Sequence, residues 1–248
     1  MKNKKQEIVV QQQFSIRATT FNNSVNWITD PKLLYAHVKA AGRPGKGLEL
    51  CCGTGIIGRV LKENGWDMTG VDITKEMLDE ASRFFNVVQH NVEDPLHFNN
   101  NVFDMVIMRQ ALFFFEPMTL LSEVKRVLKS NGKFVLSQCV PFEDSEDEKW
   151  LKKLHLTKQA LMLKFYTIND IETILIKSGF KIISKKQLSV RESVSRWMKN
   201  APEMTESKKN EVMNLIRSTP LNLQKFRDVS EDKGELMENW NWVIFNAR

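Results

Sequence analysis

The stretch LELCCGTGIIGRVL, residues 48–61, constrains the fold more than any other part of the chain. An apolar run typical of a buried strand leads into a glycine-rich turn, and a second apolar run with helical spacing follows. Glycines allow a sharp strand-to-helix turn and let a ligand approach the backbone, while the helix start offers unpaired N–H groups to an anion. Taken alone, the GxGxxG pattern at residues 53–58 is also compatible with a purely structural turn.

Two acidic residues near this turn strengthen the prediction of a ligand site. Glu49 lies within the first strand, and Asp72 ends the next one, in the stretch GVDITKEML. A carboxylate at the carboxyl end of a strand can accept hydrogen bonds from both hydroxyls of a ribose, and the following Ile73 can cover an adenine ring. These residues therefore predict a ligand that contains adenosine.

Short apolar strands alternate with helices along the first part of the chain. Strands are predicted in GLELCC, DMTGVDI, NVVQHNV, VFDMVIMRQ and KFVLSQCV, and helices in IIGRVLKENG, KEMLDEASRFF and TLLSEVKRVLKSNG. Strands that alternate with helices of this length are joined by right-handed parallel crossovers. The prediction is an α/β fold, Rossmann-like and doubly wound. It has a mostly parallel seven-stranded sheet with helices on both faces and a helical cap.

A single domain is predicted for residues 1–248, because a chain of this length can bury one sizeable core. Residues 1–44 are expected to form a helical N-terminal cover, and residues 45–140 a cofactor-binding core. Residues 141–248 are expected to complete the sheet, with WNWVIFNA as a strand, and to insert a helical cap around residues 191–226.

Composition and charge argue against several other classes of protein. The net charge of +6 is spread evenly: residues 1–140 carry 17 Lys and Arg against 14 Asp and Glu, and residues 141–248 carry 19 against 16. Because there is no basic domain, no nucleic-acid partner is expected. Cys51, Cys52 and Cys139 offer neither a disulfide framework nor a metal pair, so no metal is expected. No apolar run suits a signal peptide or a membrane span, which favours a cytoplasmic protein. A monomer or a homodimer is expected.

Four stretches carry a resemblance to a known family: LELCCGTGIIG, GVDITKEML, HNVEDPLHFNNNVFDMVIMRQAL and EVKRVLKSNGKFVLS. In order and spacing they resemble the class I S-adenosylmethionine-dependent methyltransferases, in particular the type 11 branch that contains the ubiquinone and menaquinone biosynthesis C-methyltransferases. The resemblance covers about residues 45–140, and the flanks are similar more loosely. It implies S-adenosyl-L-methionine as cofactor, S-adenosyl-L-homocysteine as product and a small organic molecule as methyl acceptor.

The resemblance also implies which residues bind the cofactor. Glu49 and the backbone of the glycine turn would hold the methionine end. Asp72 would bind the ribose, while Ile73 and Met77 would pack on the adenine. The full set implied in this way is Glu49, Cys51, Gly53, Thr54, Gly55, Asp72, Ile73, Met77, Asn91, Val92, Glu93, Arg109 and Gln110.

The chain departs from the family pattern at two of these positions. The family usually has glycine where Cys51 stands, so the backbone there is more crowded. It usually has aspartate where Asn91 stands, although a carboxamide oxygen can still accept a hydrogen bond from the adenine amino group. We therefore expect cofactor binding to be retained and weakened, and a non-catalytic cofactor-binding protein stays an alternative.

The acceptor pocket is predicted beyond the fourth strand, at Phe113 and Phe114 with the adjacent Phe115. The branch often carries histidine at the first two positions, so an apolar pocket is expected here, with core packing as the alternative. Tyr166, in KFYT, is a further candidate for this pocket, again with core packing as the alternative.

Methyl transfer from a sulfonium requires alignment of the reactants and exclusion of water rather than an acid, so no catalytic residue is assigned. If the acceptor must lose a proton, His90 and Tyr166 are the candidate bases. His37, His97 and His155 are interpreted as solvated or structural.

Other functions remain open at this point. An NAD(P)-dependent oxidoreductase would also use GTGIIG with a downstream acid, and Tyr35 and Lys39 form the YxxxK pair of short-chain dehydrogenases. That family places the pair after the glycine turn, whereas here it comes before. A methyltransferase acting on RNA or protein is a further alternative. The even charge distribution argues against RNA as its substrate.

Overall fold

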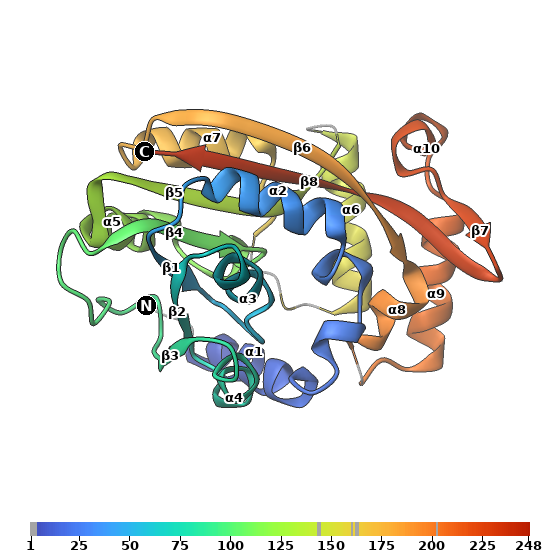
Figure 1. Cartoon of the computed structure of the whole chain (residues 1–248). Coiled ribbons are helices and arrows are strands. Elements are labelled where there is room, and N and C mark those ends of the chain that lie inside the picture. The colour runs from blue at the N-terminus through green and yellow to red at the C-terminus, as the bar shows by residue number, and fades with distance from the viewer. Residues whose placement is uncertain (1–3, 143–144, 160, 162–163, 202) are drawn as a thin grey trace.

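The computed structural model describes residues 4–142, 145–159, 161, 164–201 and 203–248 (Figure 1). One sheet forms its centre. The strands are β1 (Lys46–Leu50), β2 (Asp67–Asp72), β3 (Asn86–Gln89), β4 (Phe103–Arg109), β5 (Leu128–Val140), β6 (Ile182–Ser193), β7 (Ser230–Asp232) and β8 (Glu235–Ala247). They lie in the order β3-β2-β1-β4-β5-β8-β6, and β7 pairs with β8.

Most of the sheet is parallel. Strands β1 to β5 pair in parallel, whereas β8 runs antiparallel between β5 and β6. This arrangement confirms the predicted Rossmann-like sheet, with the short β7 as an addition to the predicted seven strands. Because parallel neighbours end at the same edge, the carboxyl ends of β1, β2, β3 and β4 lie together.

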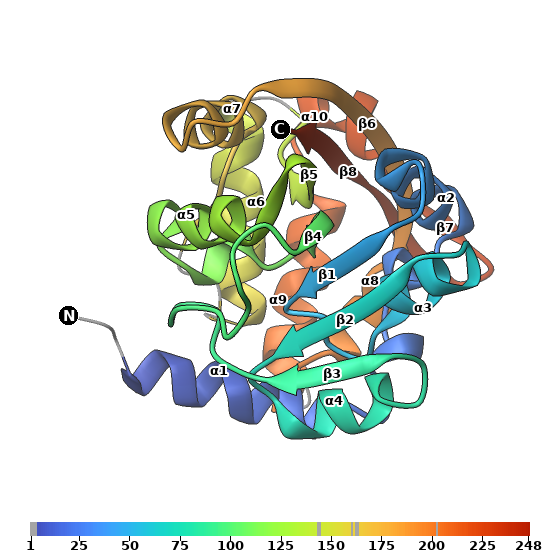
Figure 2. The ribbon, with the colours of Figure 1, turned by 60° about the vertical axis from the view of Figure 1, so that its left-hand side comes forward.

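Helices cover both faces of the sheet (Figures 1 and 2). They include α2 (Pro31–Ala41), α3 (Ile56–Glu63) and α4 (Lys75–Ala81), and on the other face α5 (Pro117–Val127) and α7 (Ile168–Lys177). Strand β4 shows why both faces are apolar: Met105 and Ile107 pack into one core cluster, and Val106 and Met108 into the other. Such continuous apolar runs are typical of parallel strands buried on both sides.

The helix ends follow local capping chemistry. Asp30 accepts a hydrogen bond from the Leu33 N–H at 2.8 Å in front of α2, and Pro31 occupies the first turn, where its missing N–H costs nothing. Thr167 and Asp170 form a reciprocal capping box at the start of α7. These local signals explain why α2 begins at Pro31 and α7 at Ile168.

The N-terminal segment crosses the edge at which the parallel strands end. It comprises α1 (Lys4–Arg17), η1 (Phe21–Asn23) and η2 (Asn26–Ile28), and Figure 2 shows α1 beside β3 and α4. The buried Glu192 carboxylate of β6 accepts backbone N–H bonds from Asn26 at 2.9 Å and from Trp27 at 3.2 Å. These bonds tie η2 to the sheet and hold the Trp27 side chain in place.

Further helices lie around the carboxyl end of β6 and the amino end of β8, which are neighbours in the sheet (Figure 1). They are α6 (Glu146–Lys158), α8 (Val194–Lys199), α9 (Glu206–Arg217) and α10 (Leu221–Arg227). No helix in the described ranges has both the length and the apolar character needed to cross a bilayer.

One predicted boundary is wrong. The helix expected to end at Asn131-Gly132 ends at Val127, because Leu128 has extended backbone angles, is buried and pairs with Phe103. The Val127 carbonyl accepts a hydrogen bond from the Val102 N–H at 2.9 Å instead of continuing the helix. Asn131 and Gly132 therefore lie within β5.

Two other predictions reach residues outside the described ranges. The stretch WLKKLHLTKQALMLKF, residues 150–165, predicts a helix. The observed α6 ends at Lys158, and the rest of the predicted range includes residues 160 and 162–163, which are not described. Within the predicted cap, Pro202 and Pro220 predict breaks between helices. Pro202 lies outside the described residues, and Pro220 stands directly before α10, as this pattern predicts.

Candidate functional site

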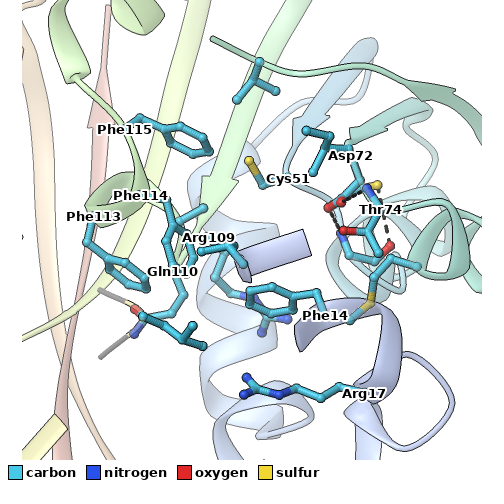
Figure 3. A pocket seen from close by; sticks show the side chains of 18 of the residues that line it. Phe14, Arg17, Cys51, Asp72, Thr74, Arg109, Gln110, Phe113, Phe114 and Phe115 are labelled. Atoms are coloured by element: carbon cyan, nitrogen blue, oxygen red, sulfur yellow. Dashed lines mark hydrogen bonds between the residues drawn. The ribbon is translucent and has the colours of Figure 1, made fainter. Parts of the chain in front are cut away.

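A cavity of about 660 Å³ lies at the edge where the parallel strands end. Ligands of open α/β sheets bind at this edge. The sequence-predicted residues that line it are Glu49, Cys51, Gly53, Asp72, Ile73, Met77, His90, Asn91, Val92, Glu93, Arg109, Gln110, Phe113 and Phe114. Figure 3 shows many of these side chains grouped around one space.

The Asp72 carboxylate holds the glycine turn from the end of β2. Its Oδ2 accepts a hydrogen bond from the Gly53 N–H at 2.9 Å, and its Oδ1 accepts one from the Thr74 N–H at 2.9 Å. Burial raises the pKa of Asp72, and these backbone donors oppose the rise. A carboxylate has about four lone-pair positions, so both oxygens can still accept bonds from a ligand's hydroxyls.

Glu49 is a buried carboxyl at the same edge. Its side chain is 4% exposed, and its Oε2 accepts a hydrogen bond from the Gly58 N–H at 2.8 Å in the first turn of α3. Burial raises the pKa of Glu49 to about 8, although the nearby Arg109 guanidinium acts in the opposite direction. Arg109 in turn donates to the Ile28 carbonyl at 3.1 Å and lies 4.9 Å from the Trp27 ring.

Two residues of the cavity wall other than glycine have left-handed backbone conformations. Cys51 follows β1 with φ 53°, and Gln110 follows the adjacent β4 with φ 54°. This conformation costs a residue with a side chain on the order of 1 kcal/mol, which explains why glycine suits the position of Cys51. Burial raises the pKa of the Cys51 thiol well above its ordinary range, so the sulfur stays protonated and is a poor nucleophile.

Three residues predicted for the site do not line this cavity in the described structure. The Thr54 hydroxyl donates to Asn22 Oδ1 at 2.5 Å and joins the turn to η1. Gly55 packs so closely that an added Cβ would lie 2.8 Å from the Phe85 ring. Tyr166 packs against the core on the α5 side and lines a much smaller cavity, with its buried hydroxyl unpaired. Thr54 and Gly55 thus hold the turn by contacts outside the cavity, and the Tyr166 ring packs against the core.

The aromatic wall lies across the cavity from the acidic edge (Figure 3). Phe113 is buried, and its ring centroid is 4.4 Å from that of Phe114. Phe114 in turn makes an edge contact with Phe14 of α1 at 5.9 Å. These contacts place the predicted phenylalanine segment in the cavity wall and join it to the N-terminal cover.

Several lining residues lie far along the chain from the glycine turn and were not predicted. They are Phe14, Arg17, Trp27, Lys158, Gln159, Trp197, Asn200 and Trp240. Phe14 and Arg17 are three residues apart on α1, and Trp197 and Asn200 are three apart on α8 and its C-cap, so helical spacing groups each pair on one face. The others come from segments that only the folded chain brings together.

The histidines fall into two groups. His90 and His155 line the cavity, whereas His37 is buried within α2, where its Nδ1 lies 2.6 Å from the Leu33 carbonyl oxygen. His97 stacks beside His90, with ring centroids 4.3 Å apart. Of the two interpretations of His155, solvated or structural, the structure supports the structural one, because its ring packs against Trp197 at 5.1 Å and burial lowers its pKa to about 3.

The described residues contain no group of three or more His, Cys, Asp or Glu side chains that could hold a metal ion. The polar chemistry of the cavity is instead carboxylates at the strand ends, backbone N–H groups of the turn and a few buried cations. This donor set suits an organic ligand with hydroxyl and amino groups.

Comparison with known proteins gives a consistent result. Residues 48–136 match the model of a family described as a methyltransferase domain. YcgJ of Bacillus subtilis, an uncharacterized methyltransferase, is 24% identical over 178 residues, which are 68% of this chain and 70% of that protein. Its crystal structure has a TM-score of 0.73 and covers 86% of this chain and 96% of that one.

Two further proteins extend the comparison. The demethylmenaquinone methyltransferase of Thermotoga maritima is 31% identical over 103 residues, 40% of this chain and 45% of that protein. The crystal structure of a SAM dependent methyltransferase from Archaeoglobus fulgidus has a TM-score of 0.58 at 19% identity, and the match covers 87% of this chain and 91% of that one.

Proposed function

We propose, since this chain belongs to the S-adenosylmethionine-dependent methyltransferases, that it transfers a methyl group from S-adenosyl-L-methionine to a small organic acceptor. One observation carries the proposal: a single cavity joins an acidic edge, made by Glu49, Asp72 and the turn at Gly53, to the aromatic wall of Phe113 and Phe114. The first end suits the cofactor and the second suits an apolar acceptor.

The residues of the acidic edge fit the cofactor as follows. Asp72 would accept hydrogen bonds from the ribose hydroxyls, with Ile73 beside the adenine. Asn91 would meet the edge of the adenine, and the Gly53 backbone and Glu49 would hold the amino-acid end. All five residues line the same cavity. The cofactor supplies an activated sulfonium methyl and a neutral thioether leaving group.

The protein's own task is then to position the acceptor and exclude water. Phe113 and Phe114 form an apolar surface that meets Phe14 from α1. The N-terminal segment, which contributes Phe14, Arg17 and Trp27 to the cavity lining, completes the site over the strand ends. A base is required only for acceptors that must lose a proton, and His90 lines the cavity for that role.

Titration calorimetry with S-adenosyl-L-homocysteine and with NADH tests this proposal against the oxidoreductase alternative. We expect saturable binding of the first ligand and none of the second. Methyl transfer itself is measured by incubating the protein with radiolabelled S-adenosyl-L-methionine and a library of small acceptors. Binding of NADH without binding of S-adenosyl-L-homocysteine would contradict the proposal, and cofactor binding without turnover on any acceptor would favour a non-catalytic protein.

Cofactor binding is expected to release a proton from Glu49. With its pKa raised to about 8, this carboxyl is mostly protonated at pH 7, and a cation bound beside it favours the ionised form. Binding at pH 7 should therefore release up to about one proton, and the affinity should rise with pH and level off above about pH 8. Calorimetry in buffers with different ionisation enthalpies measures the number of protons released.

The variant Glu49→Gln keeps the side-chain shape but cannot ionise, so it should release no proton from this position. Glu76→Gln is the matched control, because Glu76 is exposed on α4. It should behave like the unaltered protein. Equal proton release by the Glu49 variant would show that Glu49 does not face the bound cation.

A further inference from the structure

We propose that the methyl acceptor carries an anionic group, a carboxylate or a phosphate, on a flat apolar body, and that Arg17 and Lys158 bind this group. The inference rests on the proposed function and names the substrate class of the same cavity. It follows from two cations that line the acceptor end, the buried Arg17 and the partly buried Lys158. In the described part of the chain neither forms a direct ion pair, and Glu203 and Glu192 act on them only at longer range.

Arg17 is a guanidinium with unused donors. It is 7% exposed, and its Nη2 donates to Gln13 Oε1 at 3.2 Å and to Gln159 Oε1 at 2.5 Å. Its Nε is buried and has no hydrogen-bond partner among the residues that the structure describes. A guanidinium has five N–H donors in a fork that matches carboxylate and phosphate oxygens. Two neutral amides therefore hold this group in position without satisfying its charge.

Lys158 supplies a second cation next to the first. It ends α6, its Nζ lies 4.5 Å from the centroid of the Trp197 ring, and the following Gln159 is the residue that binds Arg17. Burial and the nearby Arg17 lower the pKa of Lys158 well below its ordinary value. Two like charges in a largely buried setting repel each other, so an anion bound by both would relieve this repulsion.

The rest of the cavity argues for the charge and shape of this acceptor. Its acidic residues Glu49 and Asp72 lie at the strand ends, on the cofactor side, whereas Figure 3 shows Arg17 below Phe14 and away from Asp72. At the rim, Lys164 is already paired with Glu116 at 2.7 Å. Aromatic rings line the acceptor end, which suits a planar apolar body rather than a sugar. The two cations would repel a cationic acceptor.

The test compares three probes that share a naphthalene ring: 2-naphthoate, 2-naphthyl phosphate and 2-naphthylmethanol. Each is titrated into the full-length protein saturated with S-adenosyl-L-homocysteine. At least one anion should bind about tenfold or more tightly than the neutral alcohol, because hydrogen bonds to charged groups contribute about this much. The better of the two anions identifies carboxylate or phosphate as the recognised group.

Variants then assign the preference to the two cations. Arg17→Gln and Lys158→Gln should each weaken binding of the preferred anion about tenfold while leaving the alcohol unchanged. Lys152→Gln is the matched control, since Lys152 is exposed on the same helix α6. Binding of S-adenosyl-L-homocysteine to each variant verifies that the variant is folded. If one of the two cation variants does not fold, the other is enough to test the inference.

The outcomes separate this inference from the proposed function. If S-adenosyl-L-homocysteine binds but the three probes bind equally, the inference is overturned and the proposed function stands. The same holds if both cation variants bind the anion as well as Lys152→Gln does. If S-adenosyl-L-homocysteine does not bind the unaltered protein, the proposed function fails and the inference with it.

Discussion

Replacing Arg227 with methionine is expected to lower the free energy of unfolding by about 3–5 kcal/mol, because two buried carboxylates would lose their only described cation. Arg227 Nε lies 2.7 Å from Asp147 Oδ1, and its Nη1 lies 3.1 Å from Glu238 Oε2. All three side chains are at most 2% exposed. The triad joins α10 to α6 and β8, so its loss should loosen the helices around the carboxyl end of β6 and the amino end of β8.

Thermal and denaturant unfolding measure this effect. In a chain of this size about 1 kcal/mol corresponds to about 2–4 °C, so the melting temperature should fall by roughly 6–20 °C. Arg217→Met is the matched control: Arg217 pairs with Glu231 at 3.2 Å, but the two side chains are 53% and 61% exposed. Its loss should cost less than about 1 kcal/mol. Equal effects of the two substitutions would show that burial of the triad contributes nothing.

Replacing Asp72 with alanine is expected to weaken binding of S-adenosyl-L-homocysteine by about 100-fold or more. The variant removes the proposed acceptor of two ribose hydroxyls, and hydrogen bonds to a charged group contribute about 1.5–3 kcal/mol each. It also frees the Gly53 N–H, which the Asp72 carboxylate now holds at 2.9 Å. Both effects act on the same ligand contact, and titration calorimetry measures their sum.

Two further variants separate these effects. Asp67→Ala alters an exposed acid at the opposite end of β2 and should leave the affinity unchanged. Asp72→Asn keeps one acceptor oxygen without the charge, so its affinity should lie between those of the alanine variant and the unaltered protein. An unchanged affinity in Asp72→Ala would mean that the ribose does not lie at the end of β2.

The parts of the fold that were predictable are those determined by short-range patterns. Glycines and apolar runs at residues 48–61 predict a strand, a turn and a helix, and the structure has β1 and α3 there. The end of α5 was not predictable in this way. Helical periodicity continues past Val127, but Leu128 is drawn into β5 by its pairing with Phe103, a contact between residues that are distant in the sequence.

The residues of the candidate site likewise fall into those that short-range patterns predict and those that depend on tertiary packing. Glu49, Asp72 and Phe113 could be named from the sequence because each lies near the carboxyl end of a strand, and these ends must lie at one edge of a parallel sheet. Lys158 and Trp197 could not, because they lie on helices far along the chain whose approach to that edge depends on packing. The same limit explains why Tyr166 was assigned to the cavity although it packs against the core.

The sequence by itself determined the crossover topology, the position of the glycine turn and the acidic edge, because these follow from the alternation of strands and helices along the chain. Only the tertiary structure decided what faces that edge. The cover helix α1 brings Arg17, and α6 brings Lys158, to the same cavity. They meet there because Phe14 of α1 packs against Phe114 and Leu154 of α6 packs into the core. Packing of this kind is cooperative and nonlocal, so no short stretch of sequence specifies it.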